Sequence, residues 1–392
     1  MMNATHPGRG SLSELALLFL KLGTTAFGGP AAHIAMMEDE VVRRRQWLTH
    51  AEFLDLLGAT NLIPGPNSTE MAIHIGHRRA GWPGLLVAGA CFILPAALIV
   101  TAIAWAYGRF GHLPRTDAIL HGIKPVIIAV VLQALWGLGR TAVKSRPLGV
   151  LAMLAALAAF LGVNELLVLL VGGLVMIGVR AGTGWQTGGA AMPLLAAVPG
   201  SMAGAAALPA AASAPAAFGL WPLFLFFLKV GSILYGSGYV LLAFLRADLV
   251  ERWGWLTEAQ LLDAVAVGQF TPGPVFTTAT FIGYLLAGTP GAALATVGIF
   301  LPAFVFVALS GPLIPRLRQS PLAAAFLDGV NVASLALMAV VTWQLGRVAI
   351  TDAWTAALAG VSAFLLLHFR VNSAWLVLGG AVAGVLLGMA RG

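Results

Sequence analysis

Long apolar runs, separated by short polar segments, dominate the pattern along the chain. Near-continuous apolar runs of about 20 residues recur throughout, which is the length that an α-helix needs to cross the hydrocarbon core of a bilayer. The pattern predicts an all-α polytopic membrane protein. The expected membrane segments are at about 12–37, 49–79, 84–107, 119–139, 148–162, 165–180, 218–245, 259–285, 291–310, 326–346, 353–369 and 373–390.

Two of these runs are interrupted by the same tripeptide, Pro64-Gly65-Pro66 and Pro272-Gly273-Pro274. Proline lacks a backbone donor and disfavours helix at the preceding residue, so each tripeptide must break its helix. The second proline then begins a new half-helix, whose first N–H groups are unpaired and partly positive. Each interrupted run is either a broken helix that crosses the membrane or a re-entrant hairpin, and the pattern is the same for both.

The chain contains an internal duplication. Both Pro-Gly-Pro breaks, together with lysine, glycine and tryptophan positions before them, match at one constant offset, and the match resumes after a one-residue slip. The matched pairs include Lys21 and Lys229, Gly28 and Gly236, Trp47 and Trp255, and Asp55 and Asp263. We therefore expect two homologous transmembrane repeats, at 12–180 and 220–391, joined by a linker at 181–219 that is rich in Gly, Ala and Pro.

The charges of the loops indicate that the second repeat is inverted. Arg78 and Arg79 lie where the second repeat has Leu286 and Ala287, and the cluster at 140–146 has a weaker counterpart. Positive loops face the cytoplasm, so equivalent loops are expected on opposite sides of the membrane. If each broken segment is re-entrant, each repeat has an odd number of crossings, which inverts the second repeat.

The composition narrows the classes of protein to which the chain can belong. The chain has 392 residues, is 59% hydrophobic and 9% charged, and has a formal net charge of +7. Scattered basic clusters of this kind are typical of membrane loops, so we expect no nucleic-acid partner. The single cysteine, Cys91, excludes an intramolecular disulfide. The phosphate-binding pattern of ATPases is absent, and no cofactor or metal is expected.

The repeated motifs resemble those of the chromate ion transporter (CHR) family in its two-domain form. The resemblance rests on Phe27-Gly28-Gly29-Pro30, on Trp47-Leu48-Thr49 and its repeat, and on the two Pro-Gly-Pro breaks. It implies a multi-pass bacterial inner-membrane transporter that exports chromate and confers chromate resistance, with sulfate as a competitor. The expected partners are chromate, sulfate, the lipid bilayer and a second copy of the chain.

A tetrahedral dianion requires positive charge and many hydrogen-bond donors, and both repeats supply them at matched positions. We predict substrate contacts from the lysines inside apolar runs, from the glycines, and from the hydroxyl and amide groups beside the breaks. These residues are Lys21, Gly28, Gly29, Asn67, Ser68, Thr69, Lys229, Gly236, Thr271, Thr277 and Thr278. Two alternatives stay open: the lysines pair with acids such as Asp55 or Asp263, and the hydroxyls are ordinary helix caps.

Two titratable residues are candidates for carrying a coupling proton. Glu70 lies near the start of the half-helix after the first break, and its counterpart at the same offset is Thr278. It is either a structural residue favoured by the helix dipole or a proton carrier beside the anion. His33 is a candidate relay. His74 and His77, beside Arg78, are expected at the membrane interface.

Three alternatives stand beside an ion-gradient-driven oxyanion exporter: a metal-dependent membrane enzyme, a transporter of sulfate or another anion, and a carrier of cations or neutral solutes. A metal-dependent membrane enzyme would use His33, His74 and His77, but no His-Glu-x-x-His pattern supports it. A transporter of sulfate or another anion fits the breaks equally well. A cation or neutral-solute carrier does not explain the two matched lysines.

Overall fold

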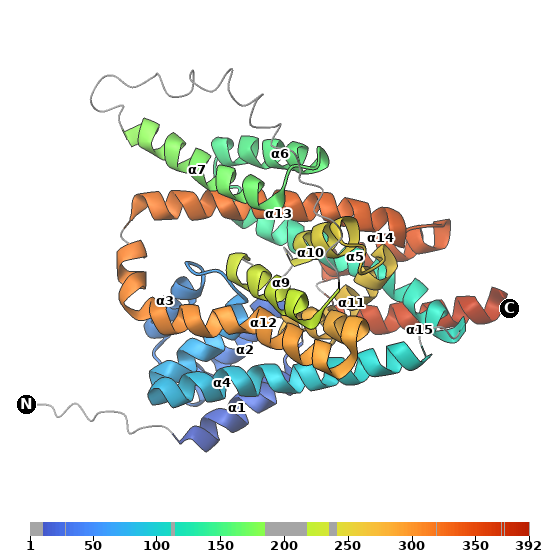
Figure 1. The fold of residues 1–392 in the computed structure, drawn as a ribbon, viewed down its shortest axis with the longest axis horizontal. Helices are drawn as coiled ribbons and strands as arrows, with labels where there is room; N and C mark the ends of the chain where they lie inside the picture. Colours follow the sequence, from blue (N-terminus) through green and yellow to red (C-terminus); the bar gives the residue numbers. More distant parts are fainter. Residues whose placement is uncertain are drawn as a thin grey trace, which may run out of the picture.

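The computed structural model describes residues 11–27, 29–110, 114–184, 218–234, 241–318, 320–369, 371 and 373–391 (Figure 1). These residues form helices, and no strand occurs among them. The first repeat contains α1 (Leu12–Thr25), α2 (Gly29–Glu38), the π-helix η1 (Asp39–Arg44), α3 (His50–Thr60), α4 (Asn67–Phe110), α5 (Pro114–Ala142), α6 (Arg146–Phe160) and α7 (Glu165–Gly184).

The second repeat has the same order of elements. It contains α9 (Leu220–Ile233), α10 (Leu241–Leu245), the π-helix η4 (Arg246–Arg252), α11 (Glu258–Phe270), the 3₁₀ turn η5 (Val275–Thr277), α12 (Thr278–Arg318), α13 (Pro321–Ala349), α14 (Ala353–Phe369) and α15 (Ser373–Arg391). A capping box starts the helix before each break, formed by Thr49 and Glu52 in α3 and by Thr257 and Gln260 in α11.

Five helical segments in the described residues are long and apolar enough to cross a membrane. They are Asn67–Phe110, Ala118–Ala142, Glu165–Gly182, Val275–Ser310 and Pro321–Ala349. The segment expected at 12–37, which Phe27-Gly28-Gly29-Pro30 interrupts in the sequence, is divided in this region: α1 ends at Thr25 and α2 begins at Gly29. At 1.5 Å per residue, α1 is about 21 Å long, shorter than the hydrocarbon core.

Helices α4 and α12 each fold back on themselves. In α4 the backbone leaves the helical region at Ala80 and at Gly81, where φ is 64°. A Cβ placed on Gly76 would lie 2.2 Å from the carbonyl oxygen of Gly84, although these residues would be about 12 Å apart in a straight helix. The short first arm, residues 67–79, is therefore about 20 Å long and packs against the start of the second arm.

The second repeat reproduces this hairpin. Gly288 has φ 62°, and a Cβ on Gly283 would lie 2.3 Å from the carbonyl oxygen of Gly291. Of the two interpretations of the Pro-Gly-Pro segments, the structure supports a hairpin, because neither first arm is long enough to cross the hydrocarbon core alone.

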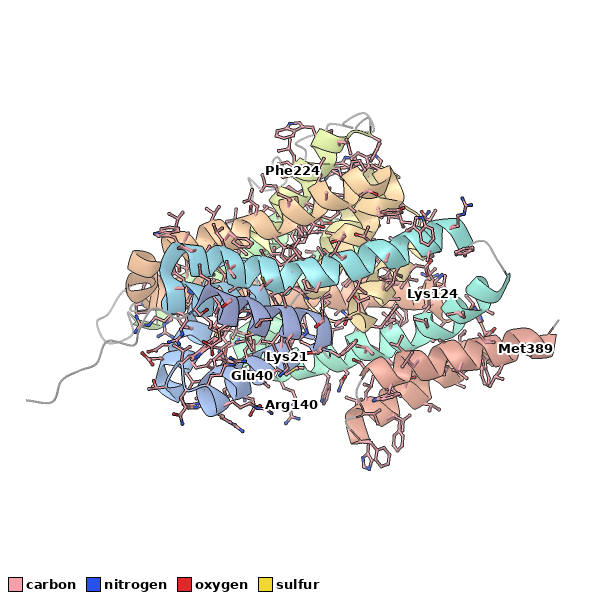
Figure 2. The ribbon with its side chains drawn as sticks, turned by 90° about the horizontal axis from the view of Figure 1, so that it is seen from below. Lys21, Glu40, Lys124, Arg140, Phe224 and Met389 are labelled. Atoms are coloured by element: carbon pink, nitrogen blue, oxygen red, sulfur yellow. The ribbon has the colours of Figure 1, made fainter. Side chains whose placement is uncertain are left out.

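Corresponding helices of the two repeats run in opposite directions. In Figure 1, α4 meets α5 at one end of the molecule, whereas α12 meets α13 at the opposite end. The perpendicular view in Figure 2 shows the same opposite courses for α4 and α12. The two halves thus have the arrangement that the loop charges predict for an inverted repeat.

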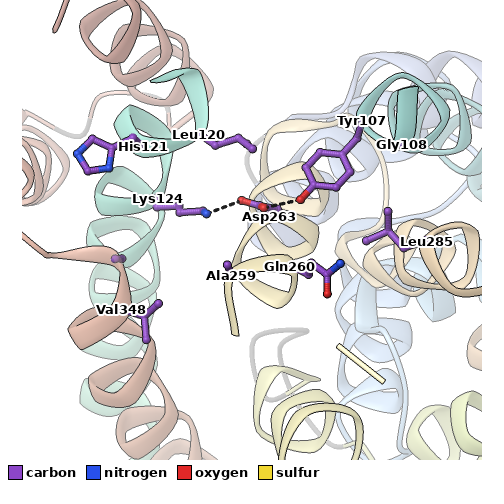
Figure 3. Close-up of a pocket in the computed structure, with 11 residues that line it drawn as sticks. Tyr107, Gly108, Leu120, His121, Lys124, Ala259, Gln260, Asp263, Leu285 and Val348 are labelled. Carbon is purple, nitrogen blue, oxygen red and sulfur yellow. Dashed lines mark hydrogen bonds and ion pairs between the residues drawn. The ribbon is translucent and has the colours of Figure 1, made fainter. Parts of the chain in front are cut away.

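Each repeat packs its last helices on the other repeat. Helix α15 lies on α5, where a Cβ on Gly122 would be 2.0 Å from the carbonyl oxygen of Gly380. Helix α7 lies on α13 in the same way, and a Cβ on Gly329 would be 2.2 Å from the carbonyl oxygen of Gly172. Lys124 of α5 also reaches Asp263 of α11 (Figure 3). The halves are therefore interlocked.

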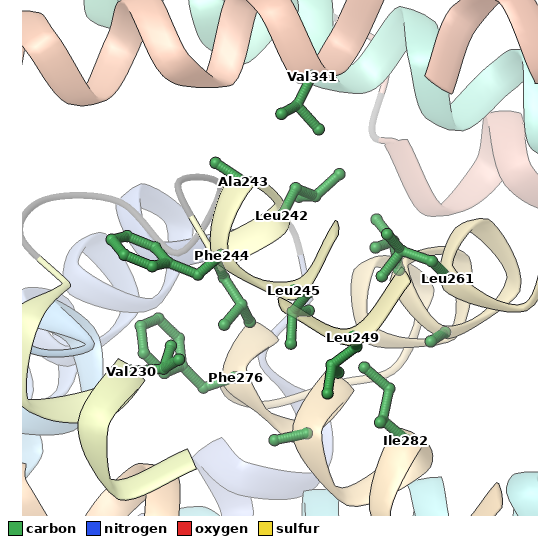
Figure 4. Packing of buried hydrophobic residues seen from close by; sticks show 14 of the residues in the cluster. Val230, Leu242, Ala243, Phe244, Leu245, Leu249, Leu261, Phe276, Ile282 and Val341 are labelled. Atoms are coloured by element: carbon green, nitrogen blue, oxygen red, sulfur yellow. The ribbon is translucent and has the colours of Figure 1, made fainter. Parts of the chain in front are cut away.

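The largest apolar core lies mainly in the second repeat and extends to the first. Leu245 and Leu249 are fully buried between α9, α11 and α12 (Figure 4). Phe276, immediately after the second break, belongs to the same cluster. The short helix α10 and the π-helix η4 therefore anchor the second break in apolar packing.

The glycine contacts predict that Gly→Ala changes the melting temperature differently at two positions of α5. Gly122→Ala should lower the melting temperature of the purified protein, because its new methyl group meets the α15 backbone and overpacking typically costs about 1–3 kcal/mol. Gly139→Ala, on the same helix, meets nothing within 4 Å and should be neutral or stabilising. Equal melting temperatures for the two variants would contradict the α5–α15 contact.

Candidate functional site

Each Pro-Gly-Pro break is joined by a backbone hydrogen bond to a helix end of the other repeat. The N–H of Gly65 donates to the carbonyl of Leu234, at the end of α9, with an N–O distance of 2.7 Å. The N–H of Gly273 donates to the carbonyl of Ala26, at the end of α1, at 2.9 Å. Ala26 and Leu234 are the C-caps of equivalent helices. Each break is therefore held by the helix end of the opposite repeat.

Glycine is required at both breaks. Gly65 and Gly273 have φ values of 142° and 86°, which side chains rarely adopt. A Cβ on Gly273 would lie 2.6 Å from the Cβ of Ala96, and one on Gly65 would lie 2.2 Å from Oε1 of Glu70. Helix α4 begins at the first break, since the N–H groups of Thr69 and Glu70 donate to the carbonyl of Pro66. Pro64, Pro66, Pro272 and Pro274 frame the two glycines.

The predicted donors at the first break are buried or partly buried. Asn67 donates its amide to Oδ1 of Asn61 at 2.8 Å, and its own Oδ1 has no partner among the described residues. Ser68 Oγ lies 3.4 Å from Nδ1 of His33. The hydroxyl of Thr69 is buried without a partner in the described part of the chain. These three side chains start α4, where the unpaired helical N–H groups also lie.

His33 links this polar cluster to the second break. Its Nε2 lies 3.1 Å from the carbonyl oxygen of Ala26, which also accepts the N–H of Gly273. A carbonyl can only accept, so Nε2 carries a hydrogen, and in the neutral ring Nδ1 accepts from Ser68. His33 is 1% exposed, and Gly29 begins its helix with φ 80°. The first break, the end of α1 and the second break are thus connected.

The donors predicted at the second break are already used. The hydroxyls of Thr271, Thr277 and Thr278 donate to the carbonyls of the residues three or four positions earlier, at 2.8 Å each. This matches the alternative in which such hydroxyls serve the local backbone. Anion contacts at this break would therefore come from backbone N–H groups. Gly28 and Gly236, also predicted as contacts, lie outside the described residues.

Glu70 is enclosed at the first break. Its side chain is completely buried and folds back over Gly65. Neither carboxyl oxygen has a hydrogen-bond partner among the described residues. His74 lies one turn further along the same arm, is 7% exposed, and also leaves its Nε2 without a partner in the described chain.

Lys21 and Lys229 bind acids at equivalent positions of the two π-helices. Lys21 Nζ lies 2.7 Å from Glu40 Oε1 (Figure 2), and Lys229 Nζ lies 2.5 Å from Asp248 Oδ2. The acid-pairing alternative is therefore what the structure shows, but with partners other than Asp55 and Asp263. Hydrogen bonds from Lys21 and then Arg45 hold the pKa of Glu40 below its usual range.

A second polar site, not predicted above, lies in a cavity of about 470 Å³ between the repeats (Figure 3). Lys124 Nζ lies 3.1 Å from Asp263 Oδ1, and the hydroxyl of Tyr107 donates to Asp263 Oδ2 at 2.8 Å. Gln260 and His121 also line the cavity. The sequence contained a signal for it: Lys124 is a charged residue inside an expected span, the criterion that selected Lys21 and Lys229.

The duplication does not require this ion pair. At the offset of the surrounding matches, Lys124 corresponds to Asn331, so the second repeat places no lysine opposite Asp55. In the pair that does form, the side chain of Asp263 is only 4% exposed and that of Lys124 is 19% exposed. The buried pair is therefore specific to one end of the interface between the repeats.

This architecture defines the class: a polytopic helical membrane protein built as an inverted repeat, with paired broken helices at the interface of its halves. The family model of the chromate transporters matches residues 13–178 and 221–385. The chain belongs to the chromate transporter family.

Curated relatives agree in length and name. The chromate transport protein of Cupriavidus metallidurans is 34% identical over 388 residues, covering 96% of this chain and 93% of that protein. The chromate transport protein of Pseudomonas aeruginosa is 32% identical over 388 residues, covering 96% and 92%. The probable chromate transport protein of Synechococcus elongatus is 32% identical over 350 residues, covering 88% and 87%. No solved structure matches the chain.

The cavity ion pair predicts a large and selective loss of stability. Lys124→Met leaves the Asp263 charge buried without its cation, and should lower the free energy of unfolding by about 3–5 kcal/mol. Lys144→Met removes an exposed pair with Asp328, in which the lysine side chain is 66% exposed, and should cost less than about 1 kcal/mol. Thermal unfolding in detergent compares them, and a Lys124→Met variant as stable as Lys144→Met would contradict the assignment.

The Lys21–Glu40 pair predicts part of the acid sensitivity. Because the pKa of Glu40 is lowered in the folded protein, its contribution to stability is complete above its usual value of 4.5 and is lost as the pH falls below it. Glu40→Gln should therefore show a smaller drop in melting temperature between pH 7 and acid pH than the unmodified protein. Identical drops in the two proteins would exclude this contribution.

Proposed function

We propose that this protein is a secondary transporter that moves chromate out of the bacterial cytoplasm across the inner membrane and so confers chromate resistance. The reciprocal hydrogen bonds from each break to a helix end of the other repeat carry the proposal, because they hold both breaks, and the helix starts that follow them, at the interface of inverted repeats. The names of the relatives supply the substrate.

The proposed anion site is at the first break and extends toward the second. The N–H groups at the start of α4, the Asn67 amide and the Thr69 hydroxyl are donors suited to a tetrahedral oxyanion. The hydroxyl of Ser68 joins them when it turns away from Nδ1 of His33. At the second break, the backbone after Pro274 contributes in the same way. Glycine at positions 29, 65 and 273 lets the backbone approach the anion closely.

In the structure, Lys21 and Lys229 bind acids and do not contact the breaks. In this proposal they contribute positive charge along the path of the anion. Their acids have additional cationic partners: Arg45 also binds Glu40, at 3.3 Å, and Arg252 binds Asp248, at 2.8 Å. Each lysine therefore exchanges its acid for an anion without leaving that acid unpaired, which lowers the cost of the exchange.

An ion gradient drives the export in this proposal. A membrane potential that is negative inside favours the outward movement of a dianion by about 4.6 kcal/mol per 100 mV, twice the value for one charge. Glu70 and His33 are the candidate residues for proton coupling. Among the described residues no three metal-ligating side chains gather, so no observation favours the membrane-enzyme alternative.

Uptake of radiolabelled chromate into everted membrane vesicles tests the proposal. We expect uptake to depend on an imposed gradient, to decrease with excess sulfate, and to fall by at least tenfold in Gly273→Val, whose side chain blocks the second break. Gly139→Ala serves as the matched control, with uptake unchanged. Uptake of sulfate without chromate would favour the other-anion alternative, and no uptake of chromate under any gradient would overturn the proposal.

A further inference from the structure

Among the described residues, no other acid shares the setting of Glu70. It is completely buried, neither oxygen has a partner among the described residues, and it lies against Gly65 within the first break. Glu40, Asp248 and Asp263, by contrast, each bind a lysine. An unpaired charge in such surroundings is costly, whereas a protonated carboxyl group is not.

The charged groups on neighbouring elements do not neutralise Glu70. Lys21 on α1 binds Glu40, Glu52 on α3 binds Arg78, and Asp263 on α11 binds Lys124. Asp55 on α3 is exposed. On α2, the titratable residue at the break is His33, which bonds Ser68 and the carbonyl of Ala26.

Glu70 shares its helix face with two histidines. His74 follows it by four residues and His77 by three more, spacings that place side chains on one face of a helix, about 5–6 Å apart at Cβ. Exposure increases along this series: Glu70 is fully buried, His74 is 7% exposed and His77 is exposed beside Arg78. When the two hairpins are aligned on Gly76 and Gly283, the counterparts of Glu70, His74 and His77 in the second repeat are Thr277, Phe281 and Tyr284. For Glu70 this is one residue before Thr278, its counterpart at the offset of the breaks. Packing of the arm therefore does not require this series.

We propose that Glu70 is a proton-binding site linked to anion binding at the first break, and that His74 and His77 form its proton route to the end of the arm. The inference rests on the proposed function. A proton that has entered at His77 passes first to Nε2 of His74, and a second transfer takes it from His74 to a carboxyl oxygen of Glu70. The reverse transfers return it.

The position of Glu70 sets the sign of this linkage. A carboxylate beside the N–H groups at the start of α4 repels an oxyanion, and protonation removes that repulsion. The anion and the proton therefore favour the same state of the site. A bound dianion with one added proton has a net charge of minus one, and Glu70 loses its proton again when the anion leaves the site.

Anion binding by the purified full-length protein at several pH values tests the linkage. Sulfate is the main probe because it stays a dianion near neutral pH, and chromate is measured beside it. We expect sulfate affinity to fall by up to tenfold per pH unit as Glu70 loses its proton, with proton uptake when sulfate binds. Glu70→Gln should bind sulfate with no pH dependence and no proton uptake.

Control variants separate this role from a structural one. Glu165→Gln makes the same chemical change in the first turn of α7, whose main contacts are with α13 and α6, and should keep the wild-type pH dependence. Glu70→Thr installs the residue of the second repeat and replaces Glu70→Gln if that variant does not fold. His74→Phe should leave the equilibrium linkage intact while slowing proton uptake at least tenfold.

The outcomes are distinct for the linkage and for the proposed function. If Glu70→Gln keeps the wild-type pH dependence, or if the wild type releases protons on binding an anion, the linkage is wrong although chromate transport stands. If the wild type binds and transports neither anion, the proposed function and the linkage both fail. A normal rate of proton uptake in His74→Phe would exclude the histidine route.

Discussion

Broken helices inside a membrane protein must find partners for the backbone groups that the break releases. In hydrocarbon an unsatisfied N–H or C=O costs several kcal/mol, so such breaks survive only where protein or water satisfies them. Here each break is satisfied by the helix end of the other repeat, Gly65 by Leu234 and Gly273 by Ala26. Separating the repeats would expose four polar backbone groups at once, so the two breaks and the two repeats depend on one another.

The duplication also distinguishes features of the architecture, which occur in both repeats, from acid–base residues that occur in only one. The backbone bonds, the glycine hairpins and the lysine–acid pairs at the π-helices occur in both repeats, so they belong to the architecture. His33, Glu70 and His74 occur only in the first repeat, and the buried Lys124–Asp263 pair occurs only at one end of the interface. The molecule is symmetric in its backbone and asymmetric in its acid–base groups.

Local signals in the sequence were sufficient for much of the fold. The Pro-Gly-Pro tripeptides predicted the helix breaks, and the constant offset predicted two repeats. The spacing of Thr49 and Glu52 is that of the capping box found at the start of α3. Inversion followed from loop charge. Each of these depends on neighbouring residues or on counting, which a sequence displays directly.

Tertiary partners were not available from the same signals. The lysines were assigned no firm partner because Glu40 and Asp248 are brought to them by π-helices that have no clear sequence signature. Thr277 and Thr278 were predicted as anion donors, but whether a hydroxyl turns to its own backbone depends on local geometry. The site as a whole stays a prediction.

The interlocked packing also constrains how the chain is assembled. Helix α5 is completed early in synthesis, yet the surface around Gly122 is covered by α15, close to the end of the chain. During translation that glycine surface therefore stays uncovered by α15, exposed to lipid or to the insertion machinery, until almost the entire protein has been made. The first repeat reaches its final form only when the ribosome is finishing the second.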